Sequence, residues 1–165
     1  MCLEGFSRVA SGSGGLSGRE VLEAIRRTAA AQSPKCAVLT CADSRLSPEL
    51  LTLSNIGDMF VVRVAGNVVT DVVYDSLKFA VEQLGVRRIY VIGHKRCGAV
   101  ALAAQGRAPP SLAAQLSEAV KRAGGDAEKA AVENVKLSCE RLKPLGAEVE
   151  GYYYDMDGPA LNKVC

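Results

Sequence analysis

Residues 88–98 read Arg-Ile-Tyr-Val-Ile-Gly-His-Lys-Arg-Cys-Gly, and this stretch decides the fold class. The run at 88–92 is short, mostly apolar and rich in β-branched residues, which is typical of a buried strand, and Gly93 ends it. Similar runs precede it at 37–40 and 59–64. Helical patterns alternate with these runs, so the sequence predicts an α/β fold. We expect a mostly parallel central sheet of four to five strands with helices on both faces.

The helices are predicted from apolar residues that recur every three or four positions. The first begins near Ser17, whose hydroxyl suits an N-cap, and it carries Val21, Leu22, Ile25 and Ala29 on one face. The same spacing predicts helices over 71–84, 98–105, 111–122 and 126–142. A last strand is expected over 148–156, before a turn at 157–158.

The chain has 165 residues and a net charge of only +2. This length suits one domain, and the small charge gives no reason to expect binding to nucleic acid or to an anionic membrane. The Gly- and Ser-rich residues 11–15 predict a flexible N-terminal arm over 1–16, followed by a single domain over 17–165. No apolar leader or membrane-spanning run is found, so we expect a cytoplasmic protein.

Six cysteines could form a disulfide framework, but the chain is not small and no leader precedes it. We therefore expect reduced thiols, of which some bind metal or do chemistry. Four have no partner at a metal-like spacing and are expected to be core thiols or exposed termini: Cys2, Cys36, Cys139 and Cys165.

The single histidine, His94, stands three residues before Cys97, directly after the predicted strand. Cys41 follows the run at 37–40 in the same way. Ligands in such sheets sit at the carboxyl ends of the strands, so these three side chains can meet if the two strands are neighbours. Two thiolates and one imidazole suit zinc and leave a fourth position open, which is the catalytic pattern. The alternative is that all three are buried core residues.

Asp43 and Arg45 share the segment that follows Cys41. The carboxylate of Asp43 could accept a hydrogen bond from metal-bound water, or it could coordinate the metal itself and close the site. Arg45 could decide between these roles by holding the carboxylate with charge-assisted hydrogen bonds. A surface ion pair of little energetic value is the alternative.

Three motifs together resemble the β-class carbonic anhydrases. They are Cys-Ala-Asp-Ser-Arg at 41–45, Ala-Gly-Asn at 65–67 and Gly-His-Lys-Arg-Cys-Gly at 93–98. The resemblance is close over roughly 36–100 and weaker to the end. One departure is Val64, which stands where the family often has an asparagine.

The resemblance implies one Zn²⁺ per chain, held by Cys41, His94 and Cys97, with Asp43 and Arg45 as the catalytic dyad. It implies further residues around the substrate, namely Ala65, Gly66, Phe79 and the backbone amide of Gly98. It also implies a β-carbonic-anhydrase-like fold that assembles as a homodimer or a larger homo-oligomer.

The activity implied is reversible hydration of CO₂ to bicarbonate and a proton by a zinc-bound hydroxide. Two thiolate ligands predict a rather high pKa for the bound water, hence activity that favours alkaline pH. The alternatives are hydrolysis of COS or CS₂ at the same site, and a zinc-binding module without catalysis.

Overall fold

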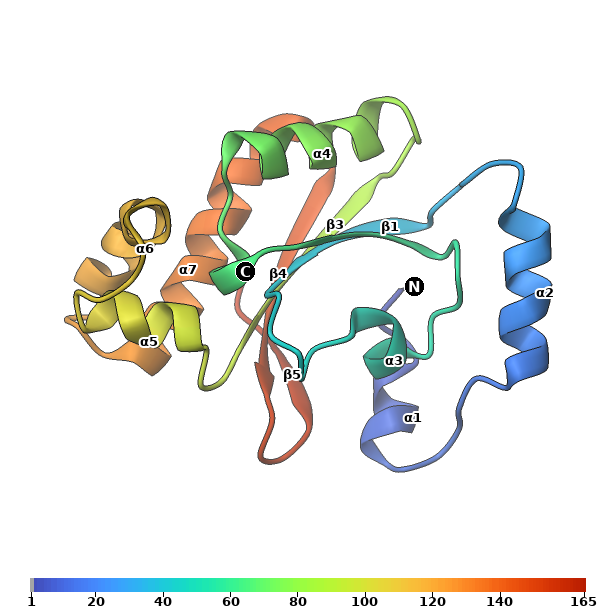
Figure 1. Cartoon of the computed structure of the whole chain (residues 1–165), viewed down its shortest axis with the longest axis horizontal. Coiled ribbons are helices and arrows are strands. Elements are labelled where there is room, and N and C mark those ends of the chain that lie inside the picture. The colour runs from blue at the N-terminus through green and yellow to red at the C-terminus, as the bar shows by residue number, and fades with distance from the viewer. Residues whose placement is uncertain (1) are drawn as a thin grey trace.

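The computed structural model of the chain describes residues 2–165, and Met1 of the expected arm lies outside them. A five-stranded sheet has the order β2-β1-β3-β4-β5 (Figure 1). β2, β1, β3 and β4 run parallel, and β5 is antiparallel to β4. The predicted mostly parallel sheet is therefore confirmed. The strands are β1 (Cys36–Thr40), β2 (Met59–Arg63), β3 (Arg88–His94), β4 (Glu148–Asp155) and β5 (Ala160–Lys163).

The helices flank this sheet. They are α1 (Phe6–Ala10), α2 (Gly18–Thr28), α3 (Pro48–Thr52), α4 (Asp71–Glu82), α5 (Gly98–Ala104), α6 (Pro110–Arg122) and α7 (Ala127–Leu142), with short 3₁₀ turns η1 (Ala65–Asn67) and η2 (Lys143–Leu145). α1, α3 and β5 were not expected from the sequence; the other helices match the predicted segments within a few residues. Across the described residues, no helix is both long and apolar enough to span a membrane.

Two apolar clusters cover the two faces of the sheet. Alternate residues of a strand point to opposite faces, so Ala37 and Leu39 of β1 pack with α4 and the second half of α7. Cys36 and Val38 belong to the other cluster. The N-terminal residues and α3 lie on that second side (Figure 1). The continuous burial of β1 on both faces is what a central parallel strand requires.

The N-terminal segment differs from the flexible arm expected over 1–16. Residues 6–10 form α1, and Cys2 is buried in the core. The ring of Phe6 packs edge-on against Tyr154, with centroids 5.8 Å apart. The Gly- and Ser-rich stretch that follows α1 suggested an arm, but the apolar side chains before it bury surface against the sheet.

Four of the six cysteines form disulfides, so the expectation of reduced thiols was wrong for them. Cys2 is bonded to Cys36, and Cys139 to Cys165. These pairs are 34 and 26 residues apart in the sequence, and only the fold brings them together. Cys41 and Cys97 are free.

α2 begins as predicted, but its apolar face does not pack as expected. Ser17 caps the helix through a reciprocal capping box with Glu20. Leu22 and Ile25 are each 46% exposed, and Ala24 is the buried residue of the helix. In Figure 1 the helix lies at the edge of the molecule, away from the sheet. The single chain thus leaves an amphipathic face uncovered.

Gly93 allows α7 to lie close against β3. A Cβ built at this position would lie 2.5 Å from Cγ2 of Val135, which is too near for two carbon atoms. We expect Gly93→Ala to lower the free energy of unfolding by about 1–3 kcal/mol, because overpacking forces the helix or strand to shift. Urea titration measures this. Gly18→Ala is the matched control, since a Cβ there meets nothing within 4 Å; equal stability of both variants would contradict the packing argument.

Candidate metal centre

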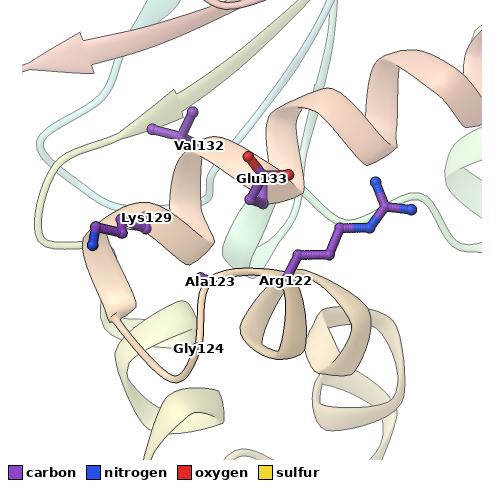
Figure 2. Close-up of a pocket in the computed structure, with 6 residues that line it drawn as sticks. All are labelled: Arg122, Ala123, Gly124, Lys129, Val132 and Glu133. Carbon is purple, nitrogen blue, oxygen red and sulfur yellow. The ribbon is translucent and has the colours of Figure 1, made fainter.

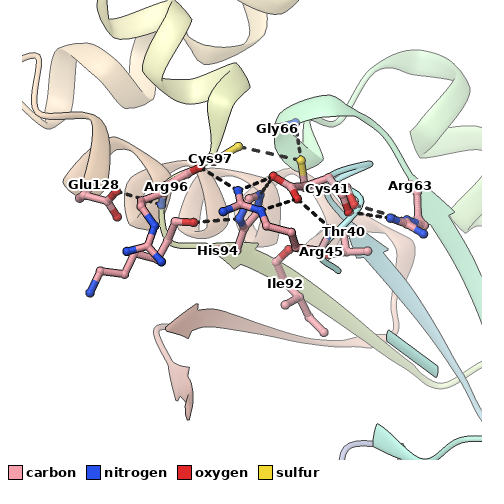
Figure 3. Close-up of polar contacts among 12 residues, drawn as sticks. Thr40, Cys41, Arg45, Arg63, Gly66, Ile92, His94, Arg96, Cys97 and Glu128 are labelled. Atoms are coloured by element: carbon pink, nitrogen blue, oxygen red, sulfur yellow. Dashed lines mark hydrogen bonds and ion pairs between the residues drawn. The ribbon is translucent and has the colours of Figure 1, made fainter. Parts of the chain in front are cut away.

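Three donor side chains meet at the carboxyl ends of β1 and β3. These strands are parallel neighbours, as the sequence argument required. Cys41 directly follows β1, His94 ends β3, and Cys97 precedes α5. One donor atom from each lies within 4.8 Å of the other two, and the two sulfurs are 3.9 Å apart. All three residues are buried, so the cluster is a preformed Cys₂His site (Figure 3).

The imidazole of His94 points an unpaired nitrogen into this cluster. Its Nδ1 lies 3.0 Å from the carbonyl oxygen of Lys95. A carbonyl only accepts, so Nδ1 carries the proton and Nε2 presents a lone pair. This Nε2 is buried and has no hydrogen-bond partner. Buried polar atoms without partners are rare and costly, and a bound metal ion would satisfy this lone pair.

The two thiols also fit a cation. The neighbouring Cys97 thiol, with further help from the Gly66 amide, lowers the pKa of Cys41 to about 4. The Cys41 thiolate and burial raise the pKa of Cys97 well above its usual range. The pair alone therefore keeps one proton. A divalent ion held by these residues would supply the charge that lets both thiols ionise, as thiolate ligation requires.

The turn at η1 supports the sulfur of Cys41. Gly66 donates its backbone N–H to Cys41 Sγ at 3.2 Å. Its φ of +70° lies in the left-handed region that favours glycine. Asn134 of α7 donates to the Gly66 carbonyl at 2.7 Å and so holds the turn. Gly66, expected beside the substrate, thus contacts a candidate ligand atom directly.

Asp43 and Arg45 form a two-pronged ion pair beside the cluster. Arg45 Nε lies 2.9 Å from Oδ1 of Asp43, and Nη2 lies 2.7 Å from Oδ2. These donors hold the pKa of Asp43 well below its usual range. Oδ2 is also 3.8 Å from Nε2 of His94, so the carboxylate lies at the edge of the metal cluster. Arg63 donates to the Asp43 carbonyl at 2.8 Å and fixes the backbone.

The other expected site residues lie at different distances from this centre. Gly98 is the first residue of α5, directly after Cys97, and Ala65 is the first residue of η1. Phe79 lies on α4 and is 46% exposed. Its ring packs against that of Phe60, with the ring centroids 6.2 Å apart. The single chain thus brings Gly98 and Ala65 to the loops that carry the cluster, and it leaves Phe79 on an outer surface.

The sequence argument missed the residues that hold the loop between His94 and Cys97. Arg96 in this loop contacts Glu128 of α7 and Asp157 of the β4–β5 turn. These partners are 32 and 61 residues away from Arg96 in the sequence. Acidic side chains at such separations carry no local signal, so the pattern could not have found them.

The cavity between α6 and α7 lies away from this centre. A cavity of about 500 Å³ lies where the end of α6 meets α7 (Figure 2). Its lining residues are Arg122, Ala123, Gly124, Lys129, Val132 and Glu133, and none of them belongs to the metal cluster. The convergence of donor atoms identifies the site instead.

The known proteins that this chain resembles in sequence include carbonic anhydrases. The family described as carbonic anhydrase matches residues 36–150. Carbonic anhydrase 2 of Mycobacterium tuberculosis is 47% identical over 72 residues, which are 44% of this chain and 35% of that protein. The chain thus matches about a third of that relative's length.

Two solved structures share the fold. A Coccomyxa β-carbonic anhydrase in complex with acetazolamide has a TM-score of 0.77 at 22% identity, over 88% of this chain and 78% of that one. A carbon disulfide hydrolase has a TM-score of 0.59 at 24% identity, over 86% and 84%. The family match covers most of the chain, including all three clustered donors. The chain therefore belongs to the β-class carbonic anhydrase family.

Proposed function

We propose that this chain binds one Zn²⁺ through Cys41, His94 and Cys97 and catalyses the reversible hydration of CO₂. The observation that carries the proposal is the buried, unpartnered Nε2 of His94 facing two thiols. Two sulfurs and one imidazole nitrogen suit zinc among the common biological metals. When bound, zinc supplies a Lewis acid that lowers the pKa of water and so provides a nucleophile near neutral pH.

Asp43 is proposed to orient the attacking water. Its carboxylate, ionised at neutral pH, can accept a hydrogen bond from water beside His94 Nε2, which lies 3.8 Å from Oδ2. Arg45 donates to both carboxylate oxygens and so holds Asp43 in its observed orientation. We infer that the fourth position stays open at rest.

Substrate approach and proton release use the remaining groups. Gly98 and Ala65 lie on the two loops beside the cluster, and we assign the Gly98 backbone amide to the substrate oxygen. His94 is the only histidine in the sequence, so no second imidazole can carry the product proton. Asp43, water and external buffer are the remaining carriers, and the turnover rate is expected to rise with buffer concentration.

Stopped-flow CO₂ hydration by zinc-loaded protein at pH 7 and pH 9 tests this function. We expect turnover at both, and faster turnover at pH 9 because two thiolates leave more negative charge on the metal. Activity at pH 9 only would show that Asp43 closes the site at neutral pH or that the water has a high pKa. No activity at either pH, with one zinc bound per chain, would overturn the proposal.

Hydrolysis of CS₂ or COS is a second candidate. The fold likeness to a carbon disulfide hydrolase supports it, and the Cys₂His donor set of this chain does not discriminate between the two reactions. A direct competition assay distinguishes the two reactions. A preference of tenfold or more for CS₂ or COS would show that one of these, and not CO₂, is the substrate. The intact Asp43–Arg45 pair argues against a non-catalytic zinc module, because a purely structural site needs no such pair.

We further propose that the chain acts as a homodimer or larger homo-oligomer. The uncovered apolar residues Leu22 and Ile25 of α2 and Val72 and Phe79 of α4 support this. A second copy could cover Phe79 and bring it beside a site, as the family resemblance implies. Multi-angle light scattering is expected to give a mass at least twice that of the chain, and an active monomer would contradict the assembly.

A further inference from the structure

The peptide group between Lys95 and Arg96 connects a candidate ligand to a distant carboxylate. On one side its carbonyl oxygen, that of Lys95, accepts from Nδ1 of His94 at 3.0 Å. On the other side its N–H, that of Arg96, donates to Oε1 of Glu128 at 2.9 Å (Figure 3). The described residues contain no cis peptide bond, so these N–H and C=O groups point in opposite directions. Glu128 and His94 thus form hydrogen bonds with opposite sides of the same peptide group.

Glu128 is itself fixed in place. It lies in the first turn of α7, and its second carboxylate oxygen accepts a hydrogen bond from the hydroxyl of Tyr153 on β4. Burial and the Glu128 carboxylate raise the pKa of Tyr153, so this hydroxyl keeps its proton and donates. A chain of hydrogen bonds therefore runs from Tyr153 through Glu128 and the peptide to His94.

The backbone of the loop depends on these bonds. Arg96 has a φ of +55°, in the left-handed region that non-glycine residues rarely adopt. Its carbonyl accepts from Nη2 of Arg45 at 3.2 Å. The same loop therefore accepts hydrogen bonds from both His94 and the arginine of the Asp43–Arg45 pair.

The ion pairs of the same loop are a weaker constraint. Asp157 binds the Arg96 guanidinium through two hydrogen bonds and Lys95 at 2.9 Å. The side chains of Arg96 and Asp157 are 50% and 54% exposed, and exposed ion pairs contribute little. The hydrogen bond that Glu128 accepts differs from these ion pairs, because its donor belongs to the same peptide group as the Lys95 carbonyl that binds His94.

We propose that Glu128 is the carboxylate partner of His94, acting through the Lys95–Arg96 peptide as a positioning residue for the metal ligand. Metal-binding histidines commonly donate their second N–H to a carboxylate or a carbonyl, which fixes the ring and raises its basicity. Here the charge of Glu128 polarises the peptide, whose carbonyl becomes a stronger acceptor for Nδ1–H. The inference rests on the proposed role of His94 as a ligand.

The single histidine makes a direct test possible. In protein labelled with ¹⁵N-histidine, the one Nδ1–H resonance reports the strength of the hydrogen bond to Lys95. We expect this resonance to move upfield, and its exchange with water to quicken, in the order wild type, Glu128→Gln, Glu128→Ala. Glutamine keeps an acceptor oxygen without the charge, so it should recover part of the effect. Both the metal-free and the zinc-loaded proteins are measured.

Zinc release to a chelator gives the second readout. Partners of metal ligands typically change metal affinity by 10- to 100-fold, and we expect about a tenfold faster release in Glu128→Ala because the effect passes through one peptide. Glu133→Ala is the matched control on the same helix, where Glu133 pairs with Lys136. Asp157→Asn weakens the side-chain ion pairs alone. Both controls should behave like wild type.

Unchanged His94 resonance and zinc release in Glu128→Ala would overturn the inference, as would equal changes in the Asp157→Asn protein. Glu128 is exposed, so its replacement does not disturb the packing of the core. Thermal melting checks the fold of each variant. Neither readout uses CO₂ turnover. A graded response in an inactive protein would reject the proposed reaction and leave the role of Glu128 standing.

Discussion

Replacing His94 by alanine is expected to abolish both stoichiometric zinc binding and CO₂ hydration. The imidazole supplies the one nitrogen donor of the cluster, and its unpaired Nε2 is what the metal satisfies. Cys41→Ser should have the same effect, because a neutral hydroxyl replaces a sulfur whose pKa the site lowers to about 4. We expect zinc content to fall from one per chain to below about 0.1, since metal affinity depends on the full ligand set.

Metal analysis after dialysis against a weak chelator measures this result. Cys165→Ser is the control for loss of a cysteine as such, because Cys165 is bonded to Cys139 and lies outside the cluster. It should keep one zinc and full activity. A His94→Ala protein that retains one zinc per chain would show that the ligand assignment is wrong.

Arg45→Ala is expected to lower kcat/KM by about 10- to 100-fold, the usual range for residues that orient a metal site. Without the guanidinium, Oδ2 of Asp43 loses its donor while Oδ1 keeps the backbone N–H of residue 45, so Oδ2 is free to move from its position 3.8 Å from His94 Nε2 toward the metal site. The pKa of Asp43 rises on loss of Arg45, because the arginine is the main cause of its lowering. An ordinary aspartate pKa of about 4 still leaves the group ionised at pH 7.

The loss should therefore persist at every pH above 6, since the position of Asp43 changes and its charge does not. Stopped-flow assays from pH 6 to 9 on zinc-loaded variants measure it. Arg45→Lys should be intermediate, because an ammonium group cannot make the two-pronged contact. Arg107→Ala removes an arginine with one weak contact to Gln105 and should keep wild-type activity. Full activity of Arg45→Ala would show that the ion pair does not orient Asp43.

Much of the site could be predicted from the sequence because its donors lie at the carboxyl ends of predicted strands. In a parallel sheet the carboxyl ends of neighbouring strands share one edge, so Cys41 and His94 had to meet once β1 and β3 were neighbours. The periodicity of the sequence could not show that β1 and β3 are neighbours in the sheet. Short-range contacts were equally readable: Asp43 and Arg45 are two residues apart, and Ser17 caps α2 through Glu20.

Contacts between distant segments were not readable. Nothing local in the sequence pairs Cys2 with Cys36 or Glu128 with the N–H of Arg96, because such pairs depend on how whole elements pack. The same reason explains α2, whose apolar stripe predicted burial although the single chain provides no surface to cover it.

The sequence by itself determined the α/β class, the parallel sheet and the identity of the candidate ligands, because periodicity and strand-end motifs are local properties of the chain. Tertiary structure alone decided the unpaired state of His94 Nε2, the proton shared by the two thiols and the support from Glu128. These features depend on distances of a few ångströms between segments far apart in the sequence. Such distances are set by the packing of α7, β3 and β4 around the loop that follows His94.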